Sequence, residues 1–70
     1  MKAKDLFEEL GFKLDRNYKD TIVWCKTDFP QCDIYFYDKD NIEIDTKYGV
    51  SVKLLEAINK QIEELGWLDD

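Results

Sequence analysis

Apolar residues near the N-terminus recur at the spacing of an amphipathic helix. They are Ala3, Leu6, Phe7 and Leu10, at positions i, i+3, i+4 and i+7. Gly11 follows, and a glycine in this place can adopt the left-handed conformation that ends a helix. The pattern predicts a helix over residues 2–10, with Phe12 packing back on Phe7.

A second stripe of apolar residues lies near the C-terminus. Its members are Val52, Leu55, Ile58, Ile62 and Leu65, with Leu54 and Ala57 at its edge. Ser51 is a suitable N-cap, and Gly66 followed by Trp67 ends the stripe. The pattern predicts a second helix between Ser51 and Gly66.

Two six-letter segments, FEELGF (7–12) and IEELGW (62–67), are nearly identical. Each ends in a glycine followed by an aromatic residue, so we interpret the echo as two helices that end by one mechanism. A duplicated repeat is the alternative, but the residues around the two segments do not match.

Three runs rich in β-branched and aromatic residues separate the two predicted helices. They are TIVWCK (21–26), DIYFYD (33–38) and NIEID (41–45). The connection between the last two is too short for a crossover, so these strands form an antiparallel hairpin. A three-residue loop over 39–41, with Asn41 in the left-handed conformation, sets Phe36 opposite Ile44.

Alternation along this hairpin predicts two different faces. One face has Ile34, Phe36, Ile42 and Ile44, and the other has Tyr35, Tyr37, Glu43 and Asp45.

The first predicted strand, residues 21–26, has apolar residues on both sides. Ile22 and Trp24 point to one side. Val23 and Cys25 point to the other, and both pairs are apolar, so the pattern leaves open which side is buried. We favour Ile22 and Trp24 because they bury more surface.

The predicted fold is α+β, with the element order α-β-β-β-α. A three-stranded antiparallel meander has two helices packed on one face, where the sheet is most apolar. Residues 12–20 could add a short edge strand through Phe12 and Leu14. The chain has 70 residues, which fits a single domain spanning 1–70.

The net charge is −6, and its distribution is uneven. Residues 1–32 hold six basic and six acidic side chains, whereas residues 33–70 hold four basic and ten acidic ones. The second half would repel a phosphate backbone, which disfavours nucleic acid as a partner.

The expected environment is the cytoplasm, a reducing compartment. The N-terminal segment is charged and contains no apolar stretch typical of a signal peptide, and no apolar run is long enough to span a membrane. In a reducing compartment, Cys25 and Cys32 would stay free thiols. A cross-strand disulfide is the alternative.

Residue types needed for most catalysis are scarce. The chain has no histidine, the commonest general base, and its only serine is the predicted cap Ser51. A C-x6-C spacing without histidine is not typical of a zinc site. We therefore expect no enzymatic activity, no cofactor and no metal.

Two groups of residues are candidate interaction sites. The first is the tyrosine-bearing face, with Tyr35, Tyr37, Glu43 and Asp45, because tyrosine is enriched in protein interfaces. The second is an acidic patch near the C-terminus, formed by Glu63, Glu64, Asp69 and Asp70. Acidic residues in a last helical turn oppose the helix dipole, so they call for an explanation.

The segments LLEAINKQIEELGW (54–67) and KAKDLFEELGF (2–12) resemble small uncharacterised proteins encoded by phages and prophages of Gram-positive bacteria. The resemblance covers both ends of the chain and leaves out its β-rich middle. It implies a bacterial cytoplasmic setting and a role in the interplay of phage and host. It assigns no functional residue.

These observations favour a non-catalytic protein-binding module of phage or prophage type, which acts through the tyrosine-bearing face or the acidic patch. One alternative is an acidic protein that mimics nucleic acid and inhibits a host DNA-binding enzyme. Another is a structural protein that self-associates, as a homodimer, through its open sheet faces.

Overall fold

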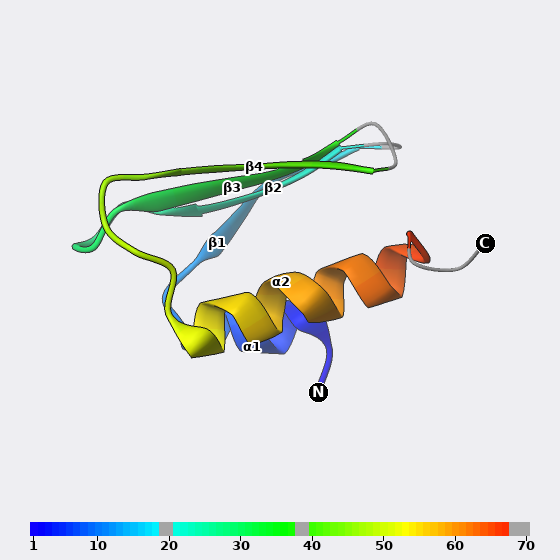
Figure 1. Ribbon diagram of the computed structural model, residues 1–70, viewed down its shortest axis with the longest axis horizontal. Coiled ribbons are helices and arrows are strands. Elements are labelled where there is room, and N and C mark those ends of the chain that lie inside the picture. Colours follow the sequence, from blue (N-terminus) through cyan, green and yellow to red (C-terminus); the bar gives the residue numbers. More distant parts are fainter. Residues whose placement is uncertain (19–20, 38–39, 68–70) are drawn as a thin grey trace.

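One four-stranded antiparallel sheet and two helices make up the computed structural model, which describes residues 1–18, 21–37 and 40–67 (Figure 1). The elements in chain order are α1 (Ala3–Glu9), β1 (Lys13–Tyr18), β2 (Thr21–Lys26), β3 (Cys32–Tyr37), β4 (Asn41–Thr46) and α2 (Val52–Leu65). The sheet order is β1-β2-β3-β4. Both helices lie on the same side of the sheet, as predicted, so the α+β class and the two-layer arrangement are confirmed.

The prediction of three strands is wrong, because β1 forms a fourth strand at the edge of the sheet. All six residues of β1 are exposed, and its register with β2 shifts between Leu14 and Arg16. A bulge inserts an extra residue and interrupts the alternation of side chains. The segment therefore lacks the apolar period of two that identifies a strand, and only the option of an edge strand within 12–20 anticipated it.

The predicted register of the second hairpin is also wrong, by two residues. Phe36 lies opposite Ile42, and Tyr37 lies opposite Asn41. Asn41 is thus a residue of β4, and the connection is residues 38–40, of which 38 and 39 lie outside the described residues. A shift of two preserves the side to which each side chain points, so the predicted faces of this hairpin are correct.

The two helices end by the same hydrogen bonds, which confirms the interpretation of the repeated letters. Gly11 N–H donates to Glu8 O at 3.0 Å, and Phe12 N–H donates to Phe7 O at 3.0 Å. At the end of α2, Gly66 and Trp67 repeat this pattern at 3.1 and 3.3 Å. Both glycines have positive φ, 92° and 73°, as this helix ending requires.

The core lies between the sheet and the helices. Phe7 of α1 stacks on Trp24 of β2, with ring centroids 4.8 Å apart. Trp24 Nε1 donates to Gln61 Oε1 of α2 at 3.0 Å, which satisfies the one polar side chain buried in the described core. Trp24 and Ile22 therefore face the helices, which settles the ambiguity of this strand.

The buried face of α2 differs from the predicted stripe. Val52 is 85% exposed and Leu55 is 50% exposed, whereas Leu54 and Ala57 are buried. The helix contains two overlapping apolar stripes, and contact with α1 and the sheet selects the one that includes Leu54.

Within the described residues, neither helix is long and apolar enough to cross a membrane.

Candidate functional site

The sheet face opposite the helices has no helix over it in the described part of the chain (Figure 1). We call it the open face. Strand register places twelve side chains there: Lys13, Arg16, Tyr18, Thr21, Val23, Cys25, Asp33, Tyr35, Tyr37, Asn41, Glu43 and Asp45. All four residues of the predicted tyrosine-bearing face are among them.

Cross-strand pairing arranges these side chains in three rows that run from β1 to β4. The first row is Lys13, Cys25, Asp33 and Asp45. The middle row is Arg16, Val23, Tyr35 and Glu43. The third row is Tyr18, Thr21, Tyr37 and Asn41. Both basic residues of these rows lie on β1, and the carboxylates of these rows lie on β3 and β4; Asp15, at the bulge of β1, belongs to none of the rows.

The centre of the open face is apolar. Val23 is only 4% exposed although it lies on the side away from the helices, and its cross-strand neighbours there are Arg16 and Tyr35. Tyr35 and Tyr37 are half-buried, and Tyr37 Oη donates to Glu43 Oε1 at 3.1 Å. Both tyrosines are thus partly shielded from solvent.

Two carboxylates lie directly opposite each other on this face. Asp33 of β3 pairs with Asp45 of β4, and like charges in such positions destabilise a sheet. Within the described residues, no lysine or arginine forms an ion pair with either of them. Sequence reasoning did not select Asp33, although it shares the alternation of Tyr35 and Tyr37 and could have been found by that spacing.

The carboxylates change the acidity of their neighbours. Burial, then the negative charge of Asp33, then a hydrogen bond to Asp33 raise the pKa of the Cys25 thiol to about 11, with burial the largest cause. Partial burial and the charges of Asp33, Asp45 and Glu43 also raise the pKa of Tyr35. Both groups are therefore protonated at neutral pH, so Cys25 is not a thiolate nucleophile.

The two cysteines lie on opposite faces of the sheet. Cys25 is on the open face, whereas Cys32 is buried in the core with its pKa raised by burial. Both are free thiols, and side chains that point to opposite sides of a sheet cannot be bridged without backbone movement. Among the described residues, no three histidine, cysteine, aspartate or glutamate side chains are grouped as metal ligands.

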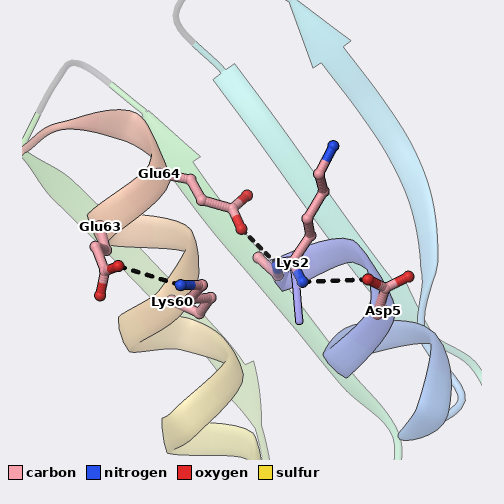
Figure 2. Close-up of polar contacts among 6 residues, drawn as sticks. Lys2, Asp5, Lys60, Glu63 and Glu64 are labelled. Atoms are coloured by element: carbon pink, nitrogen blue, oxygen red, sulfur yellow. Dashed lines mark hydrogen bonds and ion pairs between the residues drawn. The ribbon is translucent and has the colours of Figure 1, made fainter.

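The predicted acidic patch is used partly within the chain (Figure 2). Glu64 Oε2 accepts from the backbone N–H of Ala3 at 2.7 Å, which joins the end of α2 to the start of α1. Glu63 pairs with Lys60 at 3.1 Å. The first contact explains an acidic residue in the last turn of α2, because it lies at the positive N-terminal end of α1.

Asp69 and Asp70, the other members of the acidic patch, lie outside the described residues. The acidic patch as an interaction site therefore stays a prediction. Its two described members have structural partners, which makes the open face the stronger candidate.

A second exposed apolar surface lies between the helices, away from the sheet. It is a groove of about 600 Å³ lined by Met1, Leu6, Val52, Leu55, Glu56, Asn59, Lys60 and Glu63. We call it the interhelical groove. It has no tyrosine and no unpaired like-charge pair, but its exposed Val52 and Leu55 make it the main competitor of the open face.

Comparison of the chain with protein-family models, with curated proteins and with solved structures gave no match. The resemblance to phage and prophage proteins is thus untested and stays a prediction.

Proposed function

We propose that this chain is a non-catalytic protein-binding module of phage or prophage type, which acts in the bacterial cytoplasm through its open face. Tyr35 lies at the centre of the contact surface, with Val23 beside it and Glu43 at the edge. The bound partner is another protein chain.

The observation that supports this proposal is a sheet face that, within the described residues, has no helix over it, has two tyrosines near its centre and has a carboxylate pair without an ion-pair partner. Two half-buried tyrosines beside the buried Val23 provide aromatic area that a partner can cover. Asp33 and Asp45 remain in an unfavourable arrangement that a cation from a partner would relieve. Both features have a physical explanation when a second chain binds.

The side chains of the open face favour binding over catalysis. The chain has no histidine, and the thiol and phenol nearest the carboxylates have raised pKa values. General acid–base or nucleophilic chemistry near neutral pH needs groups whose pKa lies near the working pH or is lowered. Cys25 and Tyr35 are shifted in the opposite direction.

Photo-crosslinking in the organism that encodes the chain tests the proposal. Tyr35 is replaced by benzoylphenylalanine, which keeps an aromatic ring at the centre of the open face. Lys53, an exposed residue of α2, receives the same replacement as a control. We expect a covalent product with a protein chain from position 35 and not from position 53. Products from position 53 alone, or from neither position, would contradict the proposal.

A mimic of nucleic acid is the second candidate, favoured by the ten acidic residues of the second half of the chain. The open face is not uniformly acidic, however, because Lys13 and Arg16 lie on the same face. A DNA-like surface would need negative charge throughout. If the chain is a mimic, duplex DNA added to a cell lysate before irradiation should abolish the crosslinked product; if the chain binds through the open face as proposed, the product should persist.

A further inference from the structure

We infer that the protein chain bound by the open face is a second copy of this chain. Two copies would stack their open faces about a twofold axis that runs parallel to the strands. This inference rests on the proposed function, because it names the partner of the same surface.

Charge is separated across the open face. Lys13 and Arg16 lie at the β1 edge, where Asp15 at the bulge adds one carboxylate and leaves a net charge of +1 (two cations and one anion). Glu43 and Asp45 give the β4 edge a charge of −2. All five side chains are exposed. The open face is therefore basic at one edge and acidic at the other.

This separation of charge selects one of two symmetric arrangements. A twofold axis perpendicular to the strands would place β1 on β1 and β4 on β4 of the other copy, and so bring like charges together. An axis parallel to the strands, between β2 and β3, places β1 over β4 and β2 over β3 of the other copy. Only the second axis brings opposite charges together, which makes the open face complementary to itself.

The parallel axis keeps each row of side chains level with the same row of the second copy. In the middle row, Arg16 faces Glu43. Val23 and Tyr35, the apolar centre, face each other in the same row. Sheets packed face to face cross at about 30°. β1 is inclined to the other strands and approaches the helices at one end (Figure 1), so the long side chains of Lys13 and Arg16 would have to span the added distance to a second copy.

The first row explains the unfavourable carboxylate pair. Lys13 of one copy lies over Asp45 of the other, next to Asp33. The second copy thus supplies the cation that the described part of the same chain does not supply. The repulsion between Asp33 and Asp45 has no compensating charge in a single copy, and Lys13 of the second copy would offset it.

Pairing through the strand edges is less favourable. Antiparallel pairing of two β4 edges would bring Glu43 beside Asp45 or beside a second Glu43, which are like charges on one face. The bulge and charges of β1 obstruct pairing at the other edge. Of the two ways in which sheets can pair, face-to-face contact is therefore favoured.

The open face is small. Four strands of six residues give a face of about 19 by 20 Å. This area, about 380 Å² per copy, is below the range of stable interfaces, so we expect weak and transient association.

A charge-swap experiment tests the inference. The basic-edge variant has Lys13→Glu and Arg16→Glu, and the acidic-edge variant has Glu43→Lys and Asp45→Lys. Each alone should raise the dimer dissociation constant at least about tenfold, because like charges then meet at both edges. Mixed in equal amounts, they should form a heterodimer within about threefold of wild-type affinity, since an acidic face meets a basic one. Sedimentation equilibrium gives the constants, and native mass spectrometry identifies the heterodimer.

A matched control changes the same charge elsewhere. Lys4→Glu with Lys53→Glu alters two exposed helix residues and should leave the dissociation constant within about threefold. Thermal melting followed by circular dichroism shows whether each variant folds. If a double variant does not fold, the single variants Arg16→Glu and Glu43→Arg are measured alone and then mixed in the same way.

Each other outcome contradicts the inference. A wild-type chain that stays monomeric at millimolar concentration, a dimer unaffected by the edge variants, or a mixture that does not restore pairing would each overturn it. Open-ended assembly would indicate edge pairing in place of a closed dimer. If the chain is monomeric and position 35 crosslinks to a different protein, the inference fails and the proposed function stands. If position 35 captures no chain at all, both fail.

Discussion

Two adjacent residues of β3, Tyr35 and Phe36, provide a sharp test of the assigned sheet faces. Phe36 is 1% exposed and lies among the core side chains, whereas Tyr35 is half-buried on the open face. Phe36→Ala should lower the free energy of unfolding by about 3 to 5 kcal/mol, through lost burial and the cavity left behind. A domain of 70 residues is stable by only about 4 to 10 kcal/mol in total. The variant should therefore be largely destabilised or unfolded.

Tyr35→Ser should cost only about 1 kcal/mol, because it uncovers Val23 but opens no enclosed cavity. Tyr35→Phe is the matched control, since it keeps the ring and removes only the hydroxyl, and it should stay within about 0.5 kcal/mol of wild type. Urea denaturation followed by the fluorescence of Trp24 and Trp67 measures these differences. If Tyr35→Ser destabilises the fold as much as Phe36→Ala does, the assignment of Tyr35 to an open face is wrong.

Three further predictions concern the helix ends and the thiol on the open face. Gly66→Ala and Gly11→Ala should each cost about 1 kcal/mol or more, because alanine disfavours positive φ, and unchanged melting temperatures would refute the shared helix ending. Glu64→Gln should weaken the contact with the start of α1 and cost about 1 kcal/mol, whereas Glu63→Gln, in an exposed ion pair, should cost about half of that or less. Because the pKa of Cys25 is raised from 9.0 to about 11, stability should fall as pH rises through this range. Part of that loss of stability should disappear in Cys25→Ala. Identical profiles of unfolding free energy against pH for the two proteins would show that the pKa of the Cys25 thiol is not raised.

The helix ends could be predicted because their causes are local. A glycine and the aromatic residue after it determine the hydrogen bonds at the end of both α1 and α2. The faces of β3 were equally accessible, because Ile34 and Phe36 alternate strictly with Tyr35 and Tyr37. In both cases the pattern and the contact that it predicts lie within a few residues of one another.

The predictions that are wrong or absent concern features that depend on contacts between residues far apart in the sequence. β1 has no apolar period, and its pairing with β2 includes a bulge. Alternation cannot distinguish registers that differ by two residues, so Phe36 was placed opposite Ile44 in place of Ile42. The contact of Glu64 with Ala3 joins residues 61 positions apart, and no local pattern predicts it.

The candidate site also has a part that local patterns predict and a part that depends on distant contacts. Tyr35, Tyr37, Glu43 and Asp45 follow from alternation along the hairpin, and the structure places all four on the open face. The basic edge could not be predicted without β1, so the separation of charge across the face was hidden. An overall charge of −6 suggested an acidic surface, whereas the open face has both signs.

Amide NMR spectra recorded at increasing protein concentration test most directly whether the open face contacts a second copy of the chain. We predict chemical-shift changes confined to the strands, largest at Val23, Tyr35 and Glu43, while the amide signals of α2 stay unchanged. Shifts at Val52 and Leu55 would instead show that the interhelical groove is the contact surface. Spectra that do not change with concentration would contradict association through either surface.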